Sequence, residues 1–261
     1  MLSEWLTYLA ADCSAFSRKS GYLRESIGIR SRYRRCQSAW KSHLENSRSA
    51  IRVSLNSCRR HRTALVLGSG VLLDIPIDEL AARFENVWLV DLVHLPEVRR
   101  AVRRYTNVRC IEHDVTGFRE QRAALSEGGL DLSDPVQFLD EASIDWVASV
   151  NLLSQLPLLP QDWLRAHFPK IDEQKLEAWG DRIMQQHLDY LAAFGVPVCL
   201  LTDYEQTSYQ RSGEILSVVD FSTRLRFTGT LLKTWHWDVA PPGEISGGGG
   251  RFHLVASIAI S

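Results

Sequence analysis

The sequence has no long hydrophobic run. Its apolar stretches are interrupted well short of the roughly 20 residues that a membrane-spanning helix needs. The first residues include Glu4 and Asp12 and lack a basic leader before an apolar core, so we predict no secretory signal. Both absences favour a cytoplasmic protein.

Cysteine is scarce and unpatterned. The five cysteines are odd in number, scattered and free of CxxC pairs, which indicates a reducing compartment and argues against a disulfide framework or a structural zinc. No spacing of His, Asp and Glu suggests a metal site either, so we predict none. The glycine run at 247–250 is not followed by Gly-Lys-Ser/Thr, which makes it a hairpin tip and not a phosphate loop.

The net charge is −1, but the basic residues are concentrated at the start of the chain. Residues 1–62 hold thirteen Lys and Arg against four Asp and Glu, which leaves 17 basic and 27 acidic residues in the remainder. Such an asymmetry suits an arm for nucleic acid, anionic lipid or a phosphorylated substrate. It equally suits a basic helical segment that docks on an acidic body, which we favour because the two charges nearly cancel.

What the sequence does have is a strand, a glycine turn, a helix, a second strand and an acid. Residues 63–67 are apolar or β-favouring without alternation, which predicts a strand buried on both faces. Gly68 and Gly70 let the backbone turn and approach a ligand without a Cβ in the way. We expect Asp74 to cap the helix that follows. Asp91 ends the next strand, where a carboxylate can bind both hydroxyls of a ribose, so we expect a nucleoside-containing cofactor.

Strands and helices alternate from residue 63 onward, which predicts a parallel sheet covered on both faces. The expected strands are 63–67, 87–91, 107–111, 144–150, 196–202, 229–239 and 251–260. The expected helices are 74–84, 95–104, 118–126, 135–141, 172–194 and 214–219. The last two strands have no room for a crossover helix between them, so they must form an antiparallel hairpin.

The predicted fold class is therefore α/β, with a doubly wound, mostly parallel sheet of seven strands that ends in an antiparallel C-terminal hairpin. The pattern of residues 3–56 predicts two or three helices before the first strand. We divide the chain into a helical segment at 1–61, which forms a lid or a substrate-binding part, and a Rossmann-like domain at 62–261.

Five alternating strands closed by an antiparallel pair resemble the class I S-adenosylmethionine-dependent methyltransferases, over roughly residues 62–261. The turn at 66–70 looks like the family's glycine-rich first motif, and Asp91 matches the acid that holds the ribose. Asp114 sits where the family contacts the adenine amino group, and the stretch 144–156 looks like the fourth strand and the loop that faces the methyl group. The resemblance implies S-adenosylmethionine as the cofactor and the following cofactor-binding residues: Gly68, Ser69, Gly70, Asp91, Leu92, Asp114, Val115 and Asn151.

The sequence also departs from the family. Val66 stands where the family often has an acid, and Leu72 stands where a third glycine is usual. The Asn/Asp-Pro-Pro-Tyr signature of enzymes that act on exocyclic amines of bases is absent. A nicotinamide-dependent dehydrogenase is the competing interpretation of the glycines, but it would normally carry G-x-G-x-x-G, and the sixth position here is Leu73.

Polar residues at the carboxyl ends of the later strands are the candidate catalytic groups. Asn151 and Gln155 could orient a substrate or cap the next helix. Asp203 could act as a base, bind a cationic acceptor or be only a solvated loop residue. His236 lies within a strand and is a weaker candidate for a base. His94 and His113 flank the expected adenosine site as pocket walls or exposed residues.

These observations predict a methyltransferase for a small-molecule acceptor. Three alternatives stay open. The basic first quarter suits an RNA-directed methyltransferase, the degenerate first motif suits a non-catalytic partner subunit, and the same cofactor can donate its aminobutyl group, as in nicotianamine synthase-like enzymes.

Overall fold

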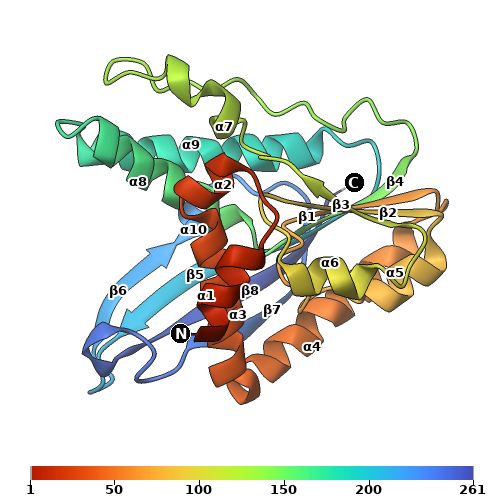
Figure 1. Cartoon of the computed structure of the whole chain (residues 1–261), viewed down its shortest axis with the longest axis horizontal. Coiled ribbons are helices and arrows are strands. Elements are labelled where there is room, and N and C mark those ends of the chain that lie inside the picture. Colours follow the sequence, from red (N-terminus) through yellow and green to blue (C-terminus); the bar gives the residue numbers. More distant parts are fainter. Residues whose placement is uncertain (1, 261) are drawn as a thin grey trace.

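The computed structural model describes residues 2–260. Eight strands of this part of the chain form one sheet, with helices on both of its faces (Figure 1). The strands are β1 (Thr63–Leu67), β2 (Asn86–Asp91), β3 (Val108–Glu112), β4 (Ile144–Val150), β5 (Val198–Tyr209), β6 (Ile215–Asp220), β7 (Thr230–Ala240) and β8 (Gly250–Ile260). The helices are α1 (Leu2–Ala10), α2 (Ala15–Lys19), α3 (Tyr22–Arg35), α4 (Gln37–Ser54), α5 (Ile77–Arg83), α6 (Pro96–Val102), α7 (Phe118–Gln121), α8 (Leu158–His167), α9 (Glu173–Ala192) and α10 (Phe221–Arg224).

The strand order is β3-β2-β1-β4-β5-β8-β7. Strands β1 to β5 run parallel, whereas β8 is antiparallel to both β5 and β7. The predicted α/β class and the antiparallel C-terminal pair are therefore confirmed. All side chains of β1 and β4 are buried, as expected for central strands covered on both faces.

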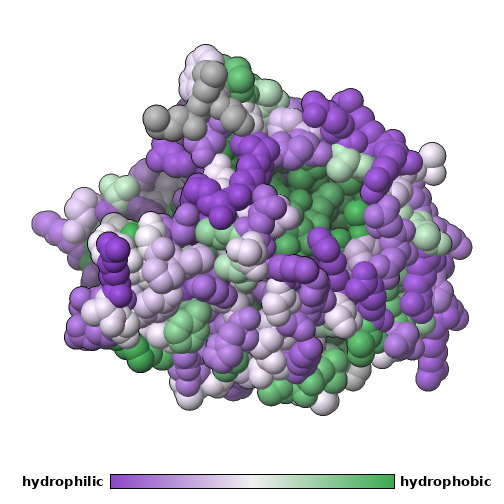
Figure 2. All heavy atoms as spheres, turned by 90° about the horizontal axis from the view of Figure 1, so that it is seen from below, coloured by the Kyte–Doolittle hydropathy of each residue, from purple (hydrophilic) through white to green (hydrophobic). Residues whose placement is uncertain are grey.

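Two hydrophobic cores lie on the opposite faces of the sheet. One core joins the sheet to α8 and α9 and includes Trp179 and Leu188. The other lies under α4 and α5 and includes Trp40, Trp146 and Leu80. The side of the molecule toward α4 to α6 is mostly hydrophilic, with an apolar hollow between the polar side chains (Figure 2).

Strand β6 is an addition to the predicted sheet. We expected a helix at 214–219, but these residues pair antiparallel with the second half of β5. The segment Ile-Leu-Ser-Val-Val is rich in β-branched residues, and Gly213 with φ +90° allows the chain to turn back between the two strands. The prediction of a helix there was wrong. The sheet has an eighth strand because β5 extends beyond β4: residues 198–201 of β5 pair with β4, and residues 205–209 pair with β6.

Two further helix predictions differ from the structure. Residues 135–141 form turns and not a helix, and Phe138 in their middle has a φ of +71°. Helix α8 was not among the expected helices. It has Pro157 at its N-cap and Pro160 in its first turn, and proline disfavours a helix interior. Proline is tolerated in the first turn of a helix, however, because the backbone N–H groups there lack intrahelical partners.

The N-terminal segment forms four helices among the described residues, where we expected two or three. Its arginines bond to carboxylates of the body: Arg30 to Glu97 at 2.8 Å and Arg35 to Glu244 at 2.7 Å. Arg52 forms a third such pair, with Glu79. The prediction that a basic segment docks on an acidic body is thus confirmed.

Candidate functional site

The glycine turn after β1 is the centre of the candidate site. Gly68 has a φ of +74°, and a Cβ there would lie 2.9 Å from the Leu152 Cβ and from the Val150 carbonyl oxygen. The turn therefore packs directly against the end of β4. Gly70 has a φ of +50°, and a Cβ there would have no contact closer than 4.0 Å, to the Gly68 carbonyl oxygen. The turn is therefore packed against protein atoms at Gly68 and free of close contacts at Gly70.

Asp91 lies at the carboxyl end of β2, next to this turn. Its Oδ2 accepts a hydrogen bond from the Gly70 N–H at 2.7 Å, and its Oδ1 accepts one from the Val93 N–H at 3.3 Å. Each oxygen keeps a lone pair for a ligand. The turn and the acid that the sequence separates by 21 residues thus form one unit.

The residues beside this unit are held by further contacts. Ser69 is buried, and its Oγ lies 3.2 Å from Nε2 of His94, a buried histidine whose pKa is lowered by desolvation. The Leu92 carbonyl accepts a hydrogen bond from the Ser17 Oγ of α2 at 3.0 Å. The N-terminal helices therefore reach the carboxyl ends of β2 and β3 (Figure 1).

Asp114 fixes the loop after β3. Its Oδ1 accepts hydrogen bonds from the Thr116 N–H and Oγ1, and its Oδ2 accepts one from the Arg119 N–H at 2.8 Å. Tyr22 of α3 is near enough to Asp114 to be affected by its charge: burial, together with this carboxylate, raises the pKa of the Tyr22 phenol.

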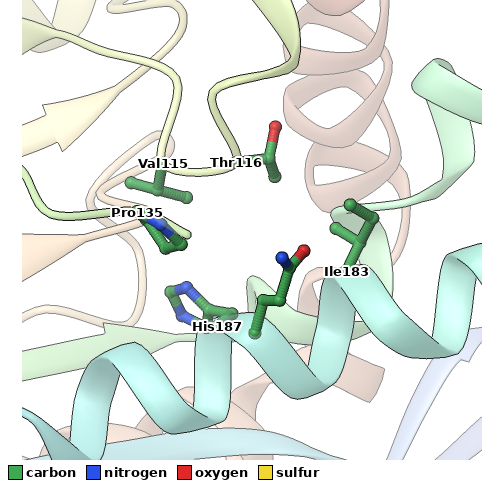
Figure 3. A pocket seen from close by; sticks show the side chains of 6 residues that line it. Val115, Thr116, Pro135, Ile183 and His187 are labelled. Atoms are coloured by element: carbon green, nitrogen blue, oxygen red, sulfur yellow. The ribbon is translucent and has the colours of Figure 1, made fainter. Parts of the chain in front are cut away.

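The next residues of the same loop line a narrow crevice (Figure 3). Val115, which is buried, and Thr116 form one wall, and Ile183 and His187 of α9 face them. Pro135 closes the crevice at the side. The loop after β3 thus faces α9 across this crevice.

Glu112 is a residue of this region that sequence reasoning missed. It pairs in register with Asp91, so two carboxylates lie side by side at the ends of β2 and β3. Both of its oxygens lie 3.3 Å from the Ser14 backbone nitrogen, which donates to them. The signal in the sequence was the strand-end position of Glu112, which matches that of Asp91.

Asn151 follows β4 and has a φ of +47°, an uncommon conformation for a residue other than glycine. Its Nδ2 donates to Asp74 Oδ2 at 2.8 Å and lies 3.3 Å from His43 Nε2 of α4. Gln155 donates from Nε2 to the Asn151 carbonyl at 2.7 Å and so braces the loop. The expected cap role of Asp74 was wrong: the N-cap of α5 is Pro76, because the helix starts three residues later than predicted.

Asp203 is buried in β5 and has three partners. Its Oδ1 lies 3.0 Å from His253 Nδ1, and its Oδ2 accepts hydrogen bonds from Ser154 Oγ and Gln206 Nε2. Burial alone would raise the pKa of this carboxyl group, but the facing imidazole and the two hydrogen bonds hold it below its usual range. His253 was missed because it lies 50 residues further along the chain, on the neighbouring β8.

The other histidines have different surroundings. His236 is exposed on β7, whereas its neighbours Trp235 and Trp237 are buried, so the strand has one exposed and one buried face here. His113 is half-buried and packs edge-on against Phe138, with its pKa lowered by desolvation.

No group of three or more His, Cys, Asp and Glu in residues 2–260 is arranged to hold a metal ion. No helix of that part of the chain is long and apolar enough to cross a membrane.

The strand order, the antiparallel β8 and the glycine turn facing an acid at the end of β2 define the fold: the chain has the class I S-adenosylmethionine-dependent methyltransferase fold. No family model matches the sequence, and no curated protein matches it.

Among solved structures, the chain is similar to 1,6-didemethyltoxoflavin-N1-methyltransferase from Burkholderia thailandensis, with 14% identity over 95% of this chain and 92% of that one and a TM-score of 0.41. It is also similar to the N-methyltransferase NodS from Bradyrhizobium japonicum WM9, with 11% identity over 82% of this chain and 86% of that one and a TM-score of 0.37. Both of those structures contain S-adenosylhomocysteine.

Proposed function

We propose that this protein is a cytoplasmic S-adenosylmethionine-dependent methyltransferase that acts on a small-molecule acceptor. The observation that carries the proposal is the unit formed by Gly70 and Asp91, where a backbone with an open side meets a carboxylate at the ends of two adjacent parallel strands. Ligands of open α/β sheets bind at this end of the strands.

The residues present fit the cofactor. Asp91 would hold the ribose hydroxyls, because each of its oxygens accepts only one backbone N–H within the described chain. The backbone from Gly68 to Gly70 would lie against the methionyl part, with Leu92 and the loop of Asp114 and Val115 beside the adenine. When bound, S-adenosylmethionine supplies a methyl group on a sulfonium that is already a good leaving group, so the protein mainly has to align the acceptor and exclude water.

Asp203 and His253 are the groups best arranged to receive a proton from the acceptor. The Asp203 carboxylate lies 3.0 Å from Nδ1 of His253, where it would stabilise the positive charge of an imidazolium, and Nε2 is the ring nitrogen left for a substrate. Nε2 is buried and has no hydrogen-bond partner within residues 2–260. An acceptor that arrives with a protonated oxygen or nitrogen would transfer that proton to Nε2.

The helical segment 1–61 is proposed to cover the cofactor site. Its Ser14 and Ser17 contact Glu112 and the Leu92 carbonyl at the ends of the strands that would hold the adenosine. Three arginines of the same segment, Arg30, Arg35 and Arg52, form ion pairs with the body, which supports a lid more than an arm for RNA.

The proposal is tested by product analysis. The protein is incubated with S-adenosylmethionine and small-molecule extracts, and the nucleoside products are followed by mass spectrometry. We expect S-adenosylhomocysteine, and we expect less of it from the His253→Ala variant. Methylthioadenosine as the product would indicate aminobutyl transfer instead, and no turnover by a protein that binds the cofactor would favour the partner-subunit alternative.

A further inference from the structure

Asp74 and Asn151 lie together beside the glycine turn although they are 77 residues apart. Asp74 follows Gly70 by four residues. Asn151 follows Val150, whose carbonyl oxygen lies against Gly68, so that a Cβ there would be 2.9 Å from it. The loop that carries Asp74 is held on its other side by Arg48 of α4, which donates to the Leu73 carbonyl.

The orientation of the Asn151 amide is determined by its partner. Its nitrogen must be the atom that faces Asp74, since two oxygens 2.8 Å apart would repel each other. The amide oxygen is then the atom of this group that does not bond to the carboxylate. This Oδ1 is buried and has no hydrogen-bond donor within residues 2–260.

The protonation of His43 follows from its other neighbour. The Trp235 indole, which can only donate, gives a hydrogen bond to Nδ1 of His43 at 3.1 Å. The proton of the neutral ring must therefore be on Nε2, which lies 3.8 Å from Asp74 Oδ1. Burial lowers the pKa of His43, so the ring brings no positive charge to this carboxylate.

The pair consequently has acceptors without matching donors. No Lys or Arg of the described residues forms an ion pair with Asp74, whose side chain is 20% exposed, and the Asn151 oxygen beside it has no partner. A buried polar atom without a partner is rare in proteins and calls for an explanation. Asn151 also keeps its positive φ, which is the type of local strain that is found at binding sites.

We propose that Asp74 and Asn151 bind a primary ammonium group, with the carboxylate and the amide oxygen both accepting its N–H donors. The inference rests on the proposed function, in which the ammonium belongs to the methionyl part of the cofactor. Asp74 then supplies the negative charge that Val66 cannot supply at the position where an acid is often found in this fold. His43 Nε2 lies 3.8 Å from Asp74 Oδ1, and the Trp235 indole fixes the His43 ring through Nδ1. The exposed part of the Asp74 carboxylate is left for the ligand.

The test compares two ligands that share the adenosine but differ in the ammonium. Calorimetry with S-adenosylhomocysteine and with methylthioadenosine is carried out on the full chain and on Asp74→Asn, which keeps an oxygen for the Asn151 N–H but loses the charge. We expect Asp74→Asn to bind S-adenosylhomocysteine about tenfold to hundredfold more weakly, the loss typical of a hydrogen bond to a charged group. Methylthioadenosine, which has no ammonium, should bind the variant within twofold of the parent protein.

Two further variants make the result specific. Asp78→Asn removes a carboxylate that bonds to Arg104 on the surface four residues away, and it should change neither affinity. Asn151→Gly suits the φ of +47° and removes the unpartnered oxygen, so it should weaken only S-adenosylhomocysteine even if Asp74→Asn fails to fold.

The outcomes separate the two proposals. If the folded Asp74 variant binds S-adenosylhomocysteine like the parent protein, or loses both ligands equally, the ammonium site is refuted and the proposed function stands. If the folded parent protein binds neither ligand, both proposals are overturned.

Discussion

Alanine substitutions at the two glycines of the turn should affect different properties: Gly68→Ala mainly lowers stability, and Gly70→Ala mainly lowers the affinity for the cofactor. For Gly68→Ala, the positive φ costs about 1–2 kcal/mol, and displacing Leu152 and the Val150 carbonyl costs about 1–3 kcal/mol more. The sum of about 2–5 kcal/mol is a large part of the roughly 5–15 kcal/mol that stabilises a typical protein. This variant should unfold at a clearly lower urea concentration.

For Gly70→Ala, only the cost of the positive φ applies, because the added Cβ has no close contact. We expect a loss of about 1–2 kcal/mol in stability. The same methyl group would stand on the open side of the turn, where we place the ligand, so the affinity for S-adenosylhomocysteine should fall at least tenfold.

Urea denaturation followed by circular dichroism measures the first effect, and calorimetric titration of the folded variants measures the second. The two experiments must rank the variants in opposite order: Gly68→Ala is the less stable, and Gly70→Ala is folded but binds weakly. If Gly70→Ala binds S-adenosylhomocysteine as tightly as the parent protein does, no ligand approaches the turn and the assignment of this site is wrong.

Two predictions concern the pH dependence of stability. His187 is buried against Ser149, and desolvation lowers its pKa from 6.5 to about 4, so its contribution is full above pH 6.5 and is lost as the pH falls toward 4, by about 3 kcal/mol. Urea denaturation between pH 7 and pH 4 should show this loss, and a His187→Gln variant with an equally steep loss would contradict it. The lowered pKa of Asp203 acts at more acidic pH: its stabilisation is present above the unfolded-state pKa of about 3.9 and disappears as the pH falls through the lower folded-state value. The Asp203→Asn variant should therefore melt below the parent protein at pH 7 and approach it near pH 3, and a constant difference in melting temperature would refute this account.

The strands that carry the site were predictable because their patterns are local. Residues 63–67 and 144–150 are rich in apolar and β-favouring residues, and both are strands with the predicted bounds. Asp91 was found for the same reason, since it ends a strand that follows the glycine turn by one helix. The last two strands could be paired from the shortness of their connection alone.

The rest depended on contacts that the sequence does not display. Residues 215–220 form a strand only because the long β5 offers an edge to pair with, so their local pattern was compatible with a helix. The pair of Asp203 and His253 arises from the insertion of β8 beside β5, and the group of Asp74 and Asn151 forms where α4 crosses the sheet. Each of these sites joins residues that are at least 50 positions apart.

The central claim is that the Gly70 and Asp91 unit binds an adenosine-containing cofactor. Calorimetric titration of the parent protein and of Asp91→Ala with S-adenosylhomocysteine tests it most directly. We predict saturable one-to-one binding that the substitution weakens by about 1–3 kcal/mol, the cost of leaving ligand hydroxyls without their partner. Absence of binding by the folded parent protein, or the same affinity in the folded variant, would contradict the claim.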